Sequence, residues 1–237
     1  MSSRTDYPRI APDLLSLMAA VSLKDVAGQV PDALPRHRHS LSRETVRASQ
    51  LMRILAATAE VVAARGYFGT TVGAIVEAAG VSTKTFYGLY PDKEEAFLAA
   101  YSALDVVMER MREAALAKTE PRAMLEAGLR AFLETLAAEP AATRMFVVEA
   151  TAAGPRVLRR RAQAYHDFAS LLAIPLALAR QRQAELPRAD EATMLAVLGA
   201  INELVLQHLV EHDAATIPGL LPTAMTLVER VFLTPAS

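Results

Sequence analysis

The chain has 237 residues, enough for one large or two small domains with a buried core. Hydrophobic residues make up 52% of the chain and charged residues 22%, which excludes intrinsic disorder over most of its length. There is no cysteine, so disulfide scaffolds, thiol nucleophiles and cysteine zinc sites are excluded.

The formal net charge is −1, but the charge is unevenly distributed along the chain. Residues 36–93 hold eight Lys or Arg against four Asp or Glu, whereas residues 94–237 hold 14 against 18. A basic segment beside an acidic remainder is a weak indication of a polyanionic partner, because Lys and Arg neutralise phosphates. An ordinary fluctuation of solvated charges explains it equally well.

The first 41 residues are predicted to be an extension and a linker. Residues 14–23 form an apolar run that could imitate a signal peptide, but Asp13 adjoins it and no clean cleavage pattern follows. A short amphipathic helix is therefore the better interpretation, and Pro, Gly and charge over 24–41 indicate a linker. No uncharged stretch resembles a membrane-spanning helix, so we expect a soluble cytoplasmic protein without a membrane partner.

From Ser42 the apolar spacing predicts a first helix that ends at Gly66. Two short helices should follow, one capped by Thr71 and running to residue 79, the other capped by Ser82. Gly80 supplies the tight turn between them. The order is thus a helix, a short helix, a turn and a second short helix.

Asp92, with Glu95 three residues on, predicts the start of a long helix that reaches about Lys118. Four or five more helices are expected over 121–137, 141–152, 156–184, 189–212 and 218–233, with a kink at Pro175. No segment shows sustained period-two alternation of β-branched residues. The predicted fold class is therefore all-α.

The two short helices and the turn between them predict a helix-turn-helix, in which a small core fixes the angle between the helices. The predicted core consists of Val72, Ile75, Val76, Val81, Phe86 and Leu89. By subtraction, Thr83, Lys84, Thr85 and Tyr87 are exposed, where they could reach base edges and phosphates in a major groove. Ser82 and Thr71 leave helix N-termini free to donate to phosphate.

Residues 66–97 resemble the DNA-binding domain of TetR-family transcriptional regulators. The features that carry the resemblance, in order, are Gly66, Thr70-Thr71-Val72, Ile75, Ala79-Gly80-Val81-Ser82, Thr85-Phe86-Tyr87, Tyr90 and Lys93-Glu94. The resemblance implies a three-helix helix-turn-helix domain over 42–91, after the extension 1–41, and a larger helical effector-binding and dimerisation domain over 92–237.

The chemistry and the resemblance together give a candidate DNA-binding set. It comprises Arg43, Arg47, Thr71, Ser82, Thr83, Lys84, Thr85, Tyr87, Tyr90 and Lys93. Three positions depart from the family pattern. Gly88 and Leu89 stand where a polar or basic residue and a histidine are common, so a phosphate contact could be lost; Val76 replaces a frequent alanine.

The candidate effector-binding residues are polar or aromatic side chains set in apolar helices: Phe146, Glu149, Tyr165, Phe168 and Asn202. The alternative for each polar residue is a satisfied structural hydrogen bond or plain exposure. Apolar stripes on the last two predicted helices suit either a four-helix interface between two subunits or the core of one subunit. They contain Leu195, Leu198, Ile201, Val205, Leu209, Leu220, Leu221, Met225, Val228 and Phe232.

The function implied by the resemblance is ligand-responsive transcriptional regulation, most simply by a homodimeric repressor released from a palindromic double-stranded DNA operator by a small-molecule effector. No cofactor, catalytic residue or metal ligand is assigned, and no enzyme activity is expected. One alternative is a zinc-dependent hydrolase built on His208, Glu211 and His212, which spell H-x-x-E-H. Another is a helical interaction protein with degenerate DNA binding.

Overall fold

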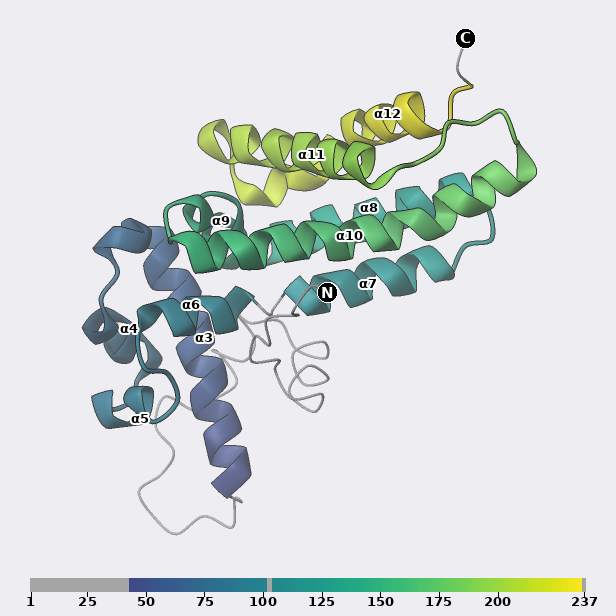
Figure 1. The fold of residues 1–237 in the computed structure, drawn as a ribbon. Helices are drawn as coiled ribbons and strands as arrows, with labels where there is room; N and C mark the ends of the chain where they lie inside the picture. Colours follow the sequence, from purple (N-terminus) through teal and green to yellow (C-terminus); the bar gives the residue numbers. More distant parts are fainter. Residues whose placement is uncertain (1–42, 102–103, 236–237) are drawn as a thin grey trace. The chain divides into compact units, whose positions relative to one another are not determined.

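The computed structural model describes residues 43–101 and 104–235, with only the backbone given for residues 43–45. The predicted helix and linker before residue 42 lie outside the described residues. Every regular element of the described residues is helical, which confirms the all-α prediction (Figure 1). The chain divides into two compact units: residues up to Val106 with Arg144–Val157, and Val107–Thr143 with the residues from Leu158 onward.

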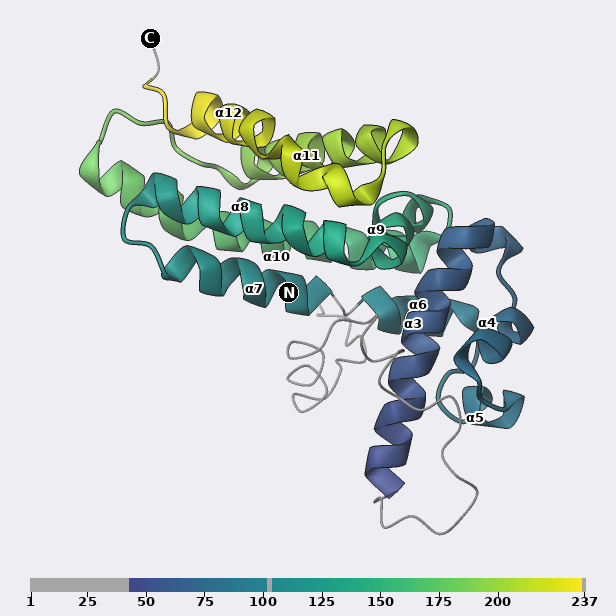
Figure 2. The ribbon, with the colours of Figure 1, turned by 180° about the vertical axis from the view of Figure 1, so that it is seen from behind.

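The first unit is built around a long helix and three shorter ones, shown from two sides in Figures 1 and 2. They are α3 (Arg43–Gly69), α4 (Val72–Ala79), α5 (Thr83–Tyr87) and α6 (Lys93–Tyr101). The helical conformation of α3 breaks at Gly66, whose φ is 70° and ψ 166°, as the sequence predicted. The short 3-10 helix η1 (Glu149–Thr151) packs against α3 and completes this unit.

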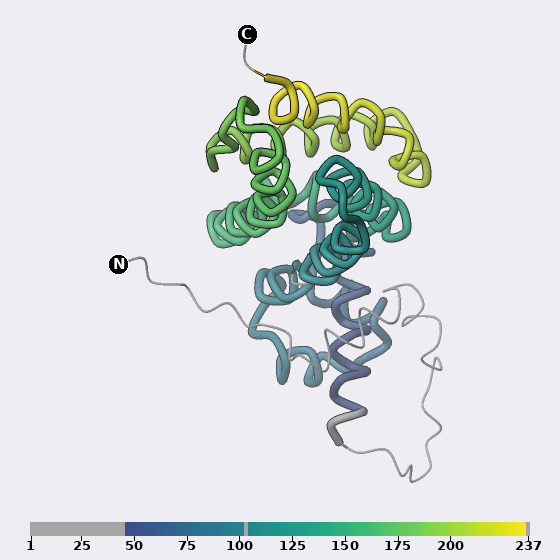
Figure 3. The backbone as a smooth tube through the Cα atoms, turned by 90° about the vertical axis from the view of Figure 1, so that its right-hand side faces the viewer, coloured from purple at the N-terminus to yellow at the C-terminus, as the bar shows by residue number. Residues whose placement is uncertain are grey.

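The second unit is a layered helical bundle. Its elements are α7 (Leu104–Leu116), α8 (Pro121–Ala138), α10 (Pro155–Arg182), α11 (Glu191–Glu211), the 3-10 helix η2 (Ala214–Leu220) and α12 (Leu221–Phe232); α9 (Pro140–Val147) leads from α8 back to the first unit. Helices α11 and α12 lie along one side of α8 and α10, and α7 lies along the other (Figures 1 and 3).

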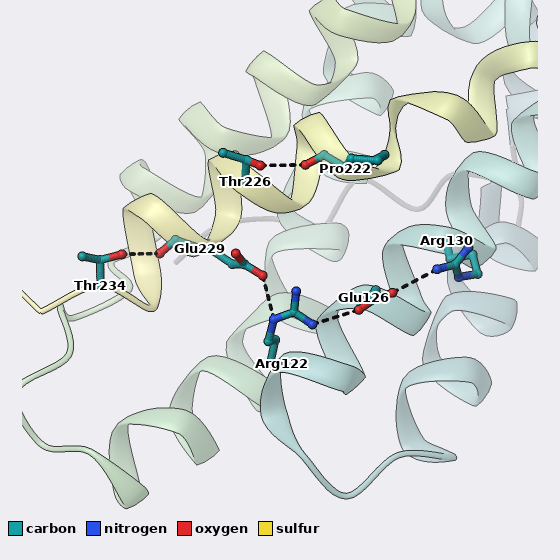
Figure 4. Close-up of polar contacts among 7 residues, drawn as sticks. All are labelled: Arg122, Glu126, Arg130, Pro222, Thr226, Glu229 and Thr234. Atoms are coloured by element: carbon teal, nitrogen blue, oxygen red, sulfur yellow. Dashed lines mark hydrogen bonds and ion pairs between the residues drawn. The ribbon is translucent and has the colours of Figure 1, made fainter.

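A surface network of three ion pairs, one of which joins α8 to α12, lies on this bundle. Arg122 on α8 meets Glu126 at 3.0 Å and Glu229 of α12 at 2.8 Å, and Arg130 meets Glu126 at 2.9 Å (Figure 4). Such surface pairs contribute little to stability. The apolar side of α12 accounts for the packing, because Leu221, Met225, Val228 and Phe232 are all buried.

Helix α11 is long and apolar enough, by length and composition alone, to cross a membrane. The core helix of a soluble protein passes the same test, so a single helix of this kind is weak evidence for a span. Only 22% of its most apolar stretch is buried within the chain. Part of its apolar surface is thus left uncovered.

The functional division predicted at residues 41 and 91 stays a prediction. The two compact units have other bounds than these predicted domains, because α6 and residues 144–157 pack with the helix-turn-helix region.

Candidate DNA-binding site and effector cavity

The turn between α4 and α5 is fixed by its caps. The Thr71 hydroxyl accepts a hydrogen bond from the Ala74 amide at 3.2 Å, and the Ser82 hydroxyl accepts one from the Thr85 amide at 3.0 Å. Gly80 has φ 59° and ψ 36°, the left-handed conformation that ends α4. Two short helices are therefore held at a defined angle, as the sequence predicted.

The residues of this motif divide into a buried core and a solvent-exposed surface. Ile75, Val76 and Phe86 are buried, and the other predicted core residues, Val72, Val81 and Leu89, are half-buried. On α5, Thr83 and Lys84 are exposed, and Tyr87 is 55% exposed. The second short helix thus presents two hydroxyls and an ammonium on a rigid support, the chemistry that reads base edges and phosphates.

The structure gives the exposure of four more members of the candidate set. Arg47, Thr71 and Ser82 are exposed, and Thr85 is half-buried, with its hydroxyl 2.8 Å from that of Ser82. The side chain of Arg43 lies outside the described residues. Their contacts with DNA stay predictions.

Tyr90 requires a correction. It was expected at the DNA surface, but it is only 8% exposed and its ring packs against Phe86 at 5.9 Å between centroids. Burial raises the pKa of the Tyr90 phenol. We therefore assign Tyr90 to the core of the motif. The presence of a tyrosine in the sequence does not by itself show whether its ring is buried or exposed.

Lys93 organises the connection between α3 and α4. Its ammonium donates to the carbonyl oxygens of Tyr67 and Thr70, both at 2.8 Å, and lies 4.5 Å from the centroid of the Tyr67 ring. Two of its three N–H groups are thereby used within the protein. A contact between the third and a phosphate stays a prediction.

We expect Lys93→Met to destabilise the protein by about 2 kcal/mol, since two charge-assisted hydrogen bonds are lost. Lys84→Met is the matched control: that side chain is exposed, so its removal should leave stability within about 0.5 kcal/mol. Urea unfolding of both variants measures the difference. Equal stability of the two would show that Lys93 is not a structural residue.

Glu149 and Phe146, two of the candidate effector residues, lie in the first unit and not at the cavity described below. A Glu149 carboxylate oxygen accepts from the Tyr67 amide at 2.9 Å, just after the break at Gly66. Phe146 is buried, with its ring 4.8 Å from that of Tyr101. As a correction, these two residues hold α9 and η1 against α3 and α6 and do not line the cavity.

The other three candidates, Tyr165, Phe168 and Asn202, line a cavity inside the second unit. The cavity has a volume of about 100 Å³, and the wider hollow around it, which includes space open to solvent, measures about 950 Å³. Most of the wall is apolar: Met111, Ala115, Leu116, Met124, Leu125, Gly128, Leu129, Phe132, Phe168, Leu171, Leu172, Ile174, Pro175, Leu198, Ile201 and Val228. Arg112, Tyr165 and Asn202 complete it. This arrangement can hold a mainly apolar small molecule.

The Tyr165 side chain is held by Arg161 one turn earlier on α10. Arg161 Nη2 donates to the Tyr165 hydroxyl oxygen at 2.8 Å, and the guanidinium lies 4.7 Å from the ring centroid. Burial raises the pKa of Tyr165, partly offset by the positive charge of Arg161. The phenol therefore stays protonated at neutral pH.

Sequence reasoning missed three arginines that support these sites. Arg161 was not among the candidate residues, although the i, i+4 spacing to Tyr165 on a predicted helix could have revealed the pair. Arg156 pairs with Glu95 of α6, and Arg53 donates to the Gly80 carbonyl at 3.4 Å. Their partners are 61 and 27 residues away in sequence, so no local sequence pattern predicts these two contacts.

The H-x-x-E-H segment does not assemble into a catalytic zinc site in the described part of the chain. The rings of His208 and His212 stack at 4.7 Å between centroids, and His208 Nε2 lies 2.8 Å from the Thr216 hydroxyl. Among the described residues no group of three His, Asp or Glu side chains could hold a metal ion. A catalytic zinc site needs three protein ligands.

A capped helix-turn-helix with an exposed second helix, joined to a helical bundle with an apolar cavity, defines a protein of the class of helical DNA-binding regulators. Residues 54–100 match the family model of bacterial regulatory proteins of the tetR family. The resemblance to TetR-family regulators is therefore confirmed: this segment is a TetR-type DNA-binding domain.

Similar solved structures extend the likeness over most of the chain. FadR from Bacillus subtilis, a transcriptional regulator in complex with stearoyl-CoA, is 18% identical, with a TM-score of 0.64 over 75% of this chain and 96% of that one. The fatty acid degradation regulator FadR from Bacillus halodurans is 18% identical, with a TM-score of 0.67 over 76% and 94%. A tetR-family protein from Rhodococcus RHA1 is 20% identical, with a TM-score of 0.57 over 79% and 98%.

These likenesses confirm the fold, with a helix-turn-helix followed by a larger helical part. No curated protein matches the chain.

Proposed function

We propose that the protein is a cytoplasmic, homodimeric repressor that binds a palindromic operator and is released from it by an apolar small-molecule effector. The observation that carries the proposal is the exposed second helix of a TetR-type domain, with Thr83, Lys84 and Tyr87 outward and Phe86 buried beneath them. Similar proteins are transcriptional regulators, and no enzyme activity is part of the proposal.

The uncovered apolar surface of α11 supports dimerisation. Val210 on this helix is 72% exposed, whereas the stripe on α12 is largely buried within the subunit. A two-fold dimer that binds a near-palindromic site needs its two recognition helices about 34–36 Å apart, which is one turn of DNA.

Selection from random duplex DNA at physiological salt, followed by sequencing of the bound pool, tests the DNA-binding part of the proposal. Enrichment of a palindrome supports a dimeric, sequence-specific regulator and supplies the operator. Failure to enrich any sequence contradicts it and favours the alternative of an interaction protein in which Gly88 and Leu89 have removed specific binding.

The apolar cavity supports an effector with a long apolar part. Stearoyl-CoA is the first compound to test, because the similar regulator from Bacillus subtilis was solved with it. Effector and operator affinities must be reciprocally coupled, so saturating effector should weaken operator binding. If stearoyl-CoA leaves operator affinity unchanged, it is not the effector of this protein.

We expect Ala115→Phe to remove the response to an effector without removing operator binding, because Ala115 lines the cavity and a phenyl ring would fill part of it. Ala117→Phe is the matched control, since Ala117 is exposed and is not a lining residue. Operator affinity is measured by fluorescence anisotropy with and without effector. A loss of at least about tenfold in effector affinity is expected for the first variant only. Equal responses in the two variants would place the effector elsewhere.

A further inference from the structure

Two polar side chains interrupt the apolar wall of the cavity. Tyr165 comes from α10 and Asn202 from α11, and both are half-buried. The one charged lining residue is Arg112, which is exposed and bound to Glu109, with Nε at 3.1 Å from one carboxylate oxygen. The polar chemistry available to a molecule in the cavity is thus mainly neutral.

The direction of the Arg161–Tyr165 hydrogen bond determines what the phenol can do. An arginine has donors only, so the Tyr165 oxygen is the acceptor and its own hydrogen is left for another partner. Within the part of the chain that the structure describes, no acceptor takes that hydrogen and no group bonds to the Asn202 amide. A neighbouring guanidinium also polarises the O–H bond, which makes the phenol a better donor.

We propose that the cavity selects an effector with a neutral carbonyl group on an otherwise apolar body, and that the Tyr165 hydroxyl donates to the carbonyl oxygen. Asn202 supplies a second polar contact. The class comprises ketones, esters, thioesters and amides, and it excludes plain hydrocarbons of the same shape. This inference rests on the proposed effector function of the cavity.

The preference for a carbonyl can be tested with two probes that differ at one atom. In 2-undecanone a carbonyl oxygen stands where 2-methyl-1-undecene has a methylene group. Displacement of N-phenyl-1-naphthylamine reports both affinities, and the chain has no tryptophan to interfere with the fluorescence. The ketone-to-alkene affinity ratio is compared among wild type, Tyr165→Phe and the control Ser170→Ala, which removes an exposed hydroxyl of α10 that does not line the cavity.

The ratio should fall about five- to tenfold in Tyr165→Phe, the loss of one hydrogen bond, and stay unchanged in Ser170→Ala. Because the ratio is compared between proteins, the different hydrophobicities of the two probes cancel. An unchanged ratio in Tyr165→Phe, with both probes still bound, overturns the carbonyl contact and leaves the effector cavity standing. If neither probe nor fluorophore binds the wild type, the effector function of the cavity and the inference fail together.

Discussion

Replacing Lys84 and Tyr87 together by alanine is expected to weaken binding of the selected operator by about 30- to 100-fold. Both side chains are exposed on α5, while Phe86 between them is buried, so the substitutions remove surface groups and leave the core intact. Each contact to a base edge is worth about 1–3 kcal/mol. Anisotropy titrations with the operator and with a scrambled duplex measure the loss.

Two controls separate a lost DNA contact from a damaged protein. Lys118→Ala removes the same charge at an exposed position of the second unit and should leave operator affinity nearly unchanged. As the second control, the Lys84, Tyr87 double variant should have the same oligomeric state as the wild type in analytical sedimentation. Undiminished operator binding by the Lys84, Tyr87 double variant would contradict our assignment of α5 as the recognition helix.

The salt dependence of the single variant Lys84→Ala shows what Lys84 contacts. A lysine that neutralises one phosphate contributes about one unit to the slope of log affinity against log salt. A reduced slope thus indicates a phosphate contact, and altered base preference at one operator position indicates readout of the sequence.

The second large effect is a loss of stability when Gly66 is replaced. Its φ of 70° and ψ of 166° fall in a region that only glycine occupies readily, and a Cβ there would lie 3.3 Å from a Glu149 carboxylate oxygen. Gly66→Ala should therefore destabilise the protein by about 2–4 kcal/mol, the sum of backbone strain and displacement of Glu149. In calorimetry this corresponds to a decrease in Tm of about 6–12 °C.

Gly73→Ala in α4 is the control, because its Cβ would meet nothing closer than the Thr71 hydroxyl at 3.8 Å. It should be neutral or stabilising by about 0.5–1 kcal/mol. The double variant Gly66→Ala, Glu149→Ala separates the two contributions to the loss of stability. If the double variant is less stable than Glu149→Ala alone, the difference in unfolding free energy is the backbone strain at residue 66. If Gly66→Ala matches the control, the break in α3 does not require glycine.

Local chemistry made much of the fold predictable. Thr71 and Ser82 were predicted as caps because a cap involves residues only three apart, and both hydrogen bonds form. Asp92 likewise accepts from the Glu95 amide at 2.9 Å. The reciprocal half of that capping box is absent, because the Glu95 carboxylate pairs with Arg156, 61 residues away.

Tertiary partners explain what the sequence could not predict about the sites. Glu149 was a candidate for the cavity because a carboxylate in an apolar helix needs a partner. The partner is the Tyr67 amide, 82 residues away in sequence, which no local pattern can identify. Tyr165, Phe168 and Asn202, by contrast, do meet at one cavity.

The first unit is discontinuous in sequence, and this affects how the protein can be synthesised and divided. Its helix-turn-helix lies within residues 43–106, but Phe146, Glu149 and Arg156 are needed to complete its packing and hydrogen bonds. On the ribosome, this unit cannot reach its final state until residue 157 has emerged, after α7 and α8. A fragment cut near residue 106 would lack these contacts, so a fragment meant to fold alone needs residues 144–157 joined to it by a designed linker.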